Sequence, residues 1–135
     1  MTTDDPRSYS ADELSTAPAV RANLAAVCED SAEWRIQKAA QYPDDARNKT
    51  SAVALSVAAR EIAELPDDDP RLETIARFWR MCRHNQDAIS NYMAEQNKAV
   101  GRHCFGTGAT LTTHELLMKL VHEALHWQDA SFGES

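Results

Sequence analysis

Hydrophobic residues recur along this chain at spacings of three and four positions, and no stretch alternates between apolar and polar residues as a half-buried strand does. This periodicity predicts helices over residues 18–41, 44–65, 69–99 and 112–130. We therefore expect an all-α protein without a β-sheet, either a four-helix bundle or a long helical-hairpin assembly.

Proline and capping residues set the expected ends of these helices. Tyr42-Pro43 should end the first helix and Pro66 the second, because proline lacks the amide hydrogen that a helix interior needs. Thr112 with Glu115 forms a capping box that should begin the last helix. A second box at Asp30 leaves open whether residues 18–41 form one helix or two.

The domain boundaries follow from the same pattern. Residues 1–17 are expected to be a flexible N-terminal arm, in which Ser10 and Glu13 could cap one short turn. Residues 18–135 are expected to form a single helical domain, since a chain of 135 residues lies within the usual range for one domain.

Two apolar stripes stand out as packing surfaces. The second predicted helix carries small residues on its inner side, which allow close helix approach: Ala52, Leu55, Ala58, Ala59, Ile62 and Leu65. The third would be about 45 Å long. Its heptad seam consists of Leu72, Ile75, Trp79, Cys82, Gln86, Ile89, Met93, Gln96 and Val100. Because this helix is longer than a compact domain needs, we expect its seam to contact another copy of the chain.

Composition and charge narrow the classes of partner. The chain has 22 alanines and 4 glycines, a formal net charge of −7 and a pI near 5.1. A net acidic charge makes nucleic-acid and anionic-membrane binding unfavourable. The chain lacks an apolar run long enough to span a membrane and a signal-peptide start, and its three cysteines form no CxxC pair. We therefore expect a cytoplasmic protein without a disulfide framework.

The segment His122-Glu123-Ala124-Leu125-His126 is the sharpest chemical motif. It matches HExxH, in which two imidazoles on one helix face bind Zn²⁺ and the glutamate acts as general base. Over these five residues the chain resembles zincin metallopeptidases, which implies His122 and His126 as metal ligands and Glu123 as the catalytic residue. A catalytic zinc also needs a third protein ligand, and only nine residues follow the motif.

The alternative interpretation of the motif is a solvated helix face. A helical projection gathers one apolar arc: Leu116, Leu117, Leu120, Val121, Ala124 and Trp127. It gathers the charged residues on the opposite side: Glu115, Lys119, His122, Glu123 and His126. Lys119 lies one turn before Glu123 and would oppose a bound dication.

Two further clusters carry weaker signals. His103, Cys104 and His114 could converge on a metal near the start of the last helix, whereas Cys82 and His84 point apart in a regular helix. Basic residues also interleave with aromatic ones along the third helix, a pattern that can grip nucleic acid: Arg77, Phe78, Trp79, Arg80 and His84. We expect this cluster instead to neutralise acidic stretches such as Asp44-Asp45 or Asp67-Asp68-Asp69 of the protein or its partner.

These observations favour a small acidic protein that acts by protein–protein interaction, as an adaptor, regulator or inhibitor, and that associates with itself without a cofactor. The first alternative is a zinc-dependent hydrolase that uses the HExxH motif at 122–126. The second is an acidic mimic of nucleic acid, which would place carboxylates along one exposed face at phosphate-like intervals.

Overall fold

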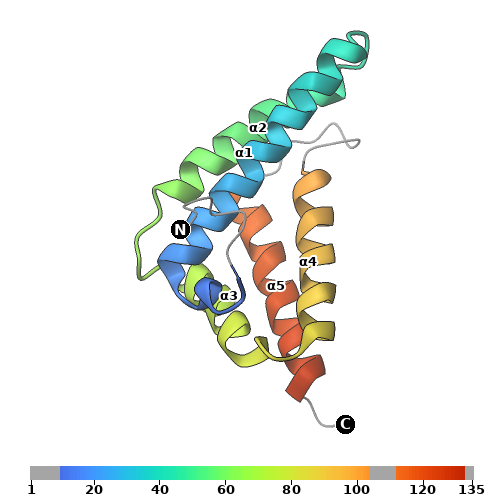
Figure 1. Ribbon diagram of the computed structural model, residues 1–135. Helices are drawn as coiled ribbons and strands as arrows, with labels where there is room; N and C mark the ends of the chain where they lie inside the picture. Colours follow the sequence, from blue (N-terminus) through green and yellow to red (C-terminus); the bar gives the residue numbers. More distant parts are fainter. Residues whose placement is uncertain (1–9, 104–111, 133–135) are drawn as a thin grey trace, which may run out of the picture.

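Helices make up the part of the chain that the computed structural model describes, residues 10–103 and 112–132 (Figure 1). They are the 3₁₀-helix η2 (Glu13–Ser15) and the α-helices α1 (Ala17–Gln41), α2 (Ala46–Ala63), α3 (Pro70–Cys82), α4 (Gln86–Gly101) and α5 (Thr113–Phe132). No strand occurs among these described residues. The prediction of an all-α fold is confirmed.

The first two helices form a long hairpin. It lies diagonally across α3, α4 and α5, and its tip projects beyond them (Figure 1). The predicted stop at Tyr42-Pro43 is confirmed, because α1 ends at Gln41. Helix α1 also runs without interruption through Asp30, which settles the question of one helix or two.

Small side chains hold the two helices of the hairpin together. The predicted inner stripe of α2 is buried except for Leu65, which lies beyond the end of the helix and is half-buried; Leu55 and Ile62 are fully inaccessible, with Ala52, Ala58 and Ala59 beside them. Cys28 and Ala32 of α1 are also buried. Alanine at these positions lets neighbouring backbones approach closely, so the hairpin is a closely packed unit.

The predicted long helix over residues 69–99 is wrong. The chain forms two helices instead, with a turn at Arg83–Asn85 in which the Asn85 amide donates to the Cys82 carbonyl (2.8 Å). The Asn85 side chain then caps α4 by accepting a hydrogen bond from the Ala88 amide (3.1 Å). Asparagine is a poor helix former but a good N-cap, so it ends one helix and begins the next without proline or glycine.

Replacing Asn85 with alanine is expected to lower the free energy of unfolding by about 1 kcal/mol, because the Ala88 amide would lose its capping acceptor. Chemical denaturation checks this value. Asn85→Asp is the matched control, since it retains a capping oxygen and should stay near the wild type. Equal losses for both variants would contradict the capping role.

Three aromatic rings connect α3 with α4 in the lower part of the bundle. Phe78 lies 4.6 Å from Tyr92 and 5.3 Å from Trp79 between ring centroids, and Trp79 meets Tyr92 edge-on at 5.7 Å. Helix α5 packs against both helices and buries Leu117 and Leu120. The core therefore continues from the hairpin through all the remaining helices.

Capping boxes begin the chain's first and last described helical segments as predicted. Ser10 and Glu13 exchange backbone-to-side-chain hydrogen bonds, as do Thr112 and Glu115. Leu14 of η2 is only 4% exposed, so the predicted arm packs on the bundle from this turn onward. Among the described residues, no helix is long and apolar enough to cross a bilayer.

Candidate functional site

The HExxH motif lies on the outer side of α5. His122 and His126 are exposed, and the His126 ring meets Trp127 edge-on with centroids 4.7 Å apart. Glu123 is half-buried, and its charge acts on the buried Tyr92 of α4. Burial raises the pKa of the Tyr92 hydroxyl, and the negative charge of Glu123 raises it further.

The described residues offer no third ligand to this motif. Nowhere in residues 10–103 and 112–132 do three or more His, Cys, Asp or Glu side chains gather in a way that could hold a metal ion. Two adjacent surface histidines can bind a metal weakly, but a catalytic zinc uses three protein ligands and an open fourth position. The motif thus lies on the solvated face that the helical projection gave as the alternative.

The other predicted ligands are held in separate places. His103 is buried beside α2, where its carbonyl accepts a hydrogen bond from Ser51 Oγ (3.0 Å). His114 is exposed on α5, with Nδ1 2.9 Å from Arg71 Nη1. Cys82 is buried while His84 is exposed, and Cys104 lies outside the described residues.

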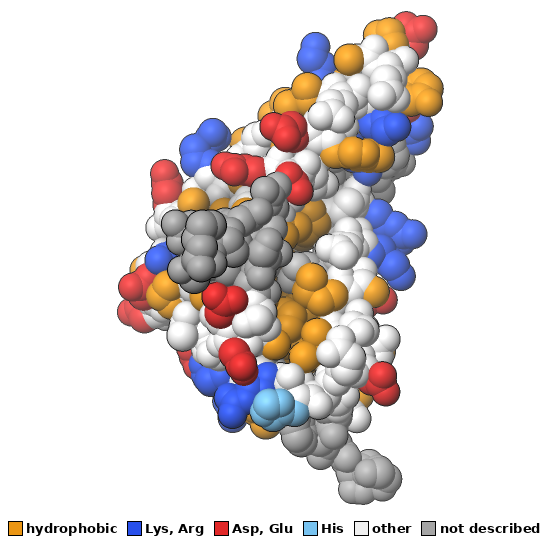
Figure 2. All heavy atoms as spheres, viewed as in Figure 1, with side chains coloured by type: hydrophobic (Ala, Val, Ile, Leu, Met, Phe, Trp, Pro, Cys, Tyr) orange, Lys and Arg blue, Asp and Glu red, His pale blue; other side chains and the backbone are white. Residues whose placement is uncertain are grey.

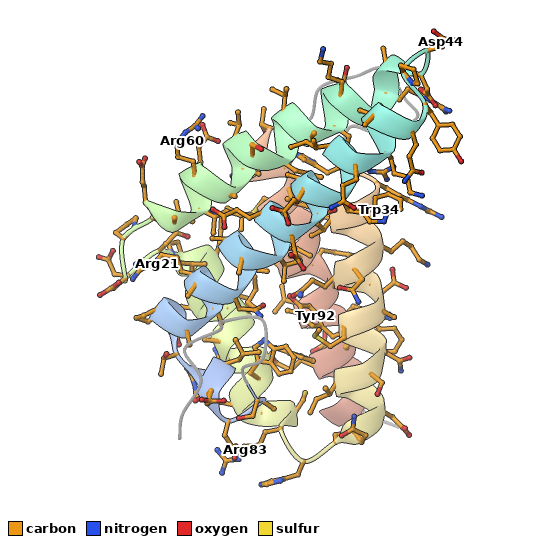
Figure 3. The ribbon with its side chains drawn as sticks, turned by 45° about the horizontal axis from the view of Figure 1, so that its top comes forward. Arg21, Trp34, Asp44, Arg60, Arg83 and Tyr92 are labelled. Atoms are coloured by element: carbon orange, nitrogen blue, oxygen red, sulfur yellow. The ribbon has the colours of Figure 1, made fainter. Side chains whose placement is uncertain are left out.

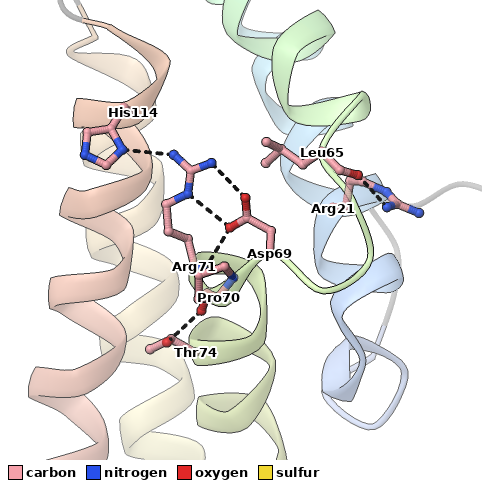
Figure 4. A network of polar contacts seen from close by, with 7 residues as sticks. All are labelled: Arg21, Leu65, Asp69, Pro70, Arg71, Thr74 and His114. Atoms are coloured by element: carbon pink, nitrogen blue, oxygen red, sulfur yellow. Dashed lines mark hydrogen bonds and ion pairs between the residues drawn. The ribbon is translucent and has the colours of Figure 1, made fainter.

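His114 belongs to a polar clasp between α3 and α5 (Figure 4). Asp69 caps α3 by accepting from the Arg71 amide (2.9 Å), and the Arg71 guanidinium donates to both Asp69 oxygens (3.0 and 2.8 Å). These hydrogen bonds lower the pKa of Asp69. Because arginine only donates, His114 Nδ1 accepts the hydrogen bond in this contact, which joins α5 to the start of α3. The clasp is structural, and periodicity alone gave no sign of it.

We expect the buried His103 to make the stability of the protein depend on pH. Burial lowers the pKa of its imidazole below the ordinary 6.5, although the nearby Glu115 acts in the opposite direction. Below pH 6.5 the unfolded chain therefore binds a proton that the folded chain resists.

Consequently the free energy of unfolding is expected to decrease as the pH falls from 6.5 toward the lowered pKa of His103. Urea unfolding of the wild type and of His103→Gln at neutral and mildly acidic pH measures this contribution. The variant should lose less stability between the two conditions than the wild type. Identical losses would show that the burial of His103 has no such effect.

The basic and aromatic cluster of α3 is used within the chain. Arg80 donates to Glu73 (2.5 Å) and to the Ser15 carbonyl (2.9 Å), and Arg83 lies 3.7 Å from Asp12. Phe78 and Trp79 are buried and cannot stack on bases. Of the predicted cluster, Arg80 is thus neutralised within the protein, by Glu73 and not by the acidic stretches that the sequence suggested, whereas Arg83 lies just outside the cluster.

Those acidic stretches have other partners. Asp45 pairs with Arg47 (2.8 Å), Asp67 with Arg21 (2.5 Å) and Asp69 with Arg71 (2.8 Å). A carboxylate held by arginine presents less negative charge to a partner, so these pairs do not favour the nucleic-acid mimic.

The predicted seam lies mostly inside the molecule. Leu72, Ile75, Trp79 and Gln96 are buried, Ile89 and Met93 are partly buried against the core, and Gln86 is exposed. The seam was expected to contact another copy of the chain because a single long helix would have extended it beyond the bundle. Once the chain turns at residues 83–85, the seam residues other than the exposed Gln86 face the protein's own core.

Among the described residues, the most exposed aliphatic side chains lie instead on the α1–α2 hairpin. Val53 is 62% exposed and Ile36 is 57% exposed, although both are aliphatic. Two adjoining grooves share Lys49, Val53 and Val57; one continues toward α5 and the other toward α1. We call this surface the hairpin face, formed by Ile36 and Ala39 of α1 and by Ala46, Lys49, Thr50, Val53, Ala54, Val57, Arg60 and Glu61 of α2.

Charged residues surround the apolar part of the hairpin face. Figure 2 shows hydrophobic atoms at the surface of the projecting hairpin, with basic and acidic side chains among them. Arg60 extends outward from α2, and Asp44 marks the tip of the hairpin (Figure 3). Thr113 Oγ1 donates a hydrogen bond to Glu61, which joins the start of α5 to one edge of the face. Val53 and Val57 lie on the side of α2 opposite its buried inner stripe. The sequence therefore already contained a signal of apolar residues on this outer side.

No protein-family model, curated protein or solved structure matches the chain.

Proposed function

We propose that the protein acts by binding another protein chain through the hairpin face, as an adaptor, regulator or inhibitor in the cytoplasm, rather than by catalysing a reaction. One observation carries this proposal: aliphatic side chains remain exposed together on a projecting hairpin. Val53 and Ile36 are each more than half exposed. Contiguous exposed apolar surface rimmed by polar residues is typical of interaction sites, whereas scattered exposed apolar residues are ordinary.

The composition of the hairpin face suits protein recognition. Val53 and Val57 lie in the middle, and Lys49, Arg60 and Glu61 stand around them. An apolar centre contributes binding energy, and a charged rim contributes orientation and specificity. Helix α2 packs mainly on α1, so its outer side is left to a partner.

The hydrolase alternative lacks comparable support. Its three motif residues lie on an exposed or half-exposed helix side, and the described residues bring no third ligand to them. We therefore place the functional surface on the hairpin and not on α5.

Site-specific photocrosslinking tests the proposal. A benzophenone amino acid is placed at Val53 and, as a matched control, at Asn91, an exposed position on α4. On irradiation in the native host, the Val53 probe should form protein adducts and the Asn91 probe should not. If the Val53 probe gave no adducts beyond those of Asn91, the hairpin face would not be a binding surface.

A further inference from the structure

We propose that the groove between α1 and α2 binds an amphipathic helix of a different protein, which carries lysine or arginine at the end that lies over the base of the hairpin. This inference rests on the proposed function and specifies the chemistry of the partner. The groove, which we call the hairpin groove, runs from Lys49 near the tip to Glu64 at the base. It adjoins the hairpin face at Ile36, Val53 and Arg60. A helix laid into an apolar groove is a recurrent mode of peptide recognition.

The floor of the hairpin groove is apolar and built largely from small residues. Two adjoining hollows of about 410 and 580 Å³ form the groove and share Ile36, Ser56 and Arg60. Their apolar lining includes Ala32, Ile36, Ala39, Val53, Ala59 and Ala63. Because an alanine side chain ends at Cβ, the floor lies below the larger Ile36 and Val53. Apolar side chains of a partner helix can therefore pack into the groove.

The groove is long enough for about four turns of a partner helix. Lys49 and Glu64 are 15 residues apart along α2 and its C-cap, which corresponds to about 22 Å along the helix axis. Within the part of the chain that the structure describes, the lining comes from α1 and α2 alone. The remaining helices of the bundle thus do not fill the groove.

Three carboxylates line the base end of the groove. Glu29 and Glu33 lie on successive turns of α1, and Glu64 lies at the end of α2. Over residues 10–103 and 112–132, none of these three side chains forms a hydrogen bond or an ion pair, and neither does Arg60, which shares this end. Figure 2 shows acidic side chains gathered over the lower half of the hairpin. The base end therefore has more negative than positive charge, and that charge is not paired within the described chain.

Carboxylates elsewhere on the hairpin and beside it are held by arginine. Asp67 and Asp69 pair with arginines at 2.5 and 2.8 Å. At the tip, Asp45 is held in the same way (2.8 Å), and neither Asp44 nor Asp45 lines the groove. Lys49 is the charged residue of the groove at that end. The unpaired negative charge of the groove thus lies at its base, which fixes the end at which a basic partner residue is favourable.

The end of α2 adds negative potential at the same place. Glu64 is the C-cap of α2, where the last carbonyl groups carry the partial negative charge of the helix dipole. A cation is favourable at this position and a carboxylate is not. A partner's lysine or arginine over the base would therefore interact with the three carboxylates and with the carbonyl end of α2 at once.

Charge also indicates which class of molecule occupies the groove. Carboxylates repel nucleic acid and anionic lipid. A second copy of this chain has few basic side chains to offer from its best supply, since three of the four arginines in α3 and its C-cap are paired within the chain: Arg71 with Asp69, Arg80 with Glu73 and Arg83 with Asp12. A basic helix of another protein is thus the occupant that the charges favour.

Selection from a random library of peptides of about 16 residues tests this chemistry on the purified protein. Enriched peptides should have apolar residues at spacings of three and four and lysine or arginine clustered at one end. Enrichment of acidic peptides, enrichment of apolar peptides without basic residues, or the absence of any enriched peptide would each overturn the inference.

Charge reversal shows whether an enriched peptide lies in the groove. By fluorescence anisotropy, Glu29→Lys/Glu33→Lys should bind the peptide at least about tenfold more weakly than wild type. The matched control Asp87→Lys/Asp129→Lys changes the net charge equally at exposed positions of α4 and α5, and should bind as the wild type does. A peptide with glutamate in place of its basic residues should prefer the reversed variant, which would also show that this variant is folded.

Equal affinities of the two double variants would overturn the inference, because the peptide would then not depend on the carboxylates of the groove. The proposed function is tested separately by the Val53 probe. Adducts of that probe with a protein of the host would still support the proposed function after such a result, whereas their absence would remove it.

Discussion

Replacing Phe78 with alanine is expected to lower the free energy of unfolding by about 3–5 kcal/mol. Phe78 is completely buried and touches two other aromatic rings, those of Trp79 and Tyr92. Its removal would leave a cavity where α3 and α4 meet, and these neighbours are too constrained to fill it. The loss should be visible as a lower urea midpoint in circular dichroism.

Met81→Ala is the matched control, because Met81 lies on the same helix but is 40% exposed. This variant should change the free energy of unfolding by no more than about 0.5 kcal/mol. A Phe78→Ala loss as small as that of the control would mean that the aromatic cluster does not form the core of the lower bundle.

Replacing Arg35 with methionine is expected to lower the free energy of unfolding by about 2–3 kcal/mol. The Arg35 guanidinium donates to the Gly101 carbonyl (2.5 Å) and to Asn48 Oδ1 (3.2 Å). It therefore ties α1 to both α2 and the end of α4. Asn48 is only 5% exposed, so its oxygen would lose a charged donor without free access to water.

Lys38→Met controls for the loss of a positive charge from α1. Both Arg35 and Lys38 lie over the Trp34 ring, at 4.9 and 5.2 Å from its centroid, but the Lys38 amine donates to Gln41 within its own helix and does not bridge two helices of the described part of the chain. We expect its effect on thermal and urea unfolding to be within about 0.5 kcal/mol. Similar losses for both variants would contradict the bridging role of Arg35.

Local signals in the sequence correctly predicted several of the helix ends. Tyr42-Pro43 stopped α1, and capping boxes at Ser10 and Thr112 formed as expected. These features depend on residues within one turn of each other, so sequence alone is sufficient to identify them.

The missed turn at Asn85 shows the limit of periodicity. The spacing of three and four residues continued from Cys82 through Gln86 to Ile89, although Gln86 is exposed and α4 buries Ala88, Tyr92 and Gln96 in the core that it shares with α3. A heptad pattern cannot distinguish one helix from two that share a core. Asn85, a residue type that favours the N-cap position, was a local signal of this turn.

The location of the candidate site also depends on tertiary structure and not on local sequence signals. Whether Leu72 or Val53 is exposed depends on which helices cover it, and that arrangement follows from the turn at Arg83–Asn85. The sequence therefore identified apolar stripes without showing which one stays uncovered. The HExxH motif has the spacing of two zinc ligands on one helix face. Whether a third ligand lies near it depends on long-range contacts, which the motif does not determine.

The account depends on a partner chain covering the hairpin face. This is tested most directly by maleimide labelling of Val53→Cys, quantified by mass spectrometry of the labelled peptide, with Asn91→Cys as reference. Labelling at 53 relative to 91 is compared between intact host cells and dilute purified protein. We predict that position 53 is protected in cells and reactive in the dilute protein. Equal relative labelling in both would contradict the claim that this surface is where the protein acts.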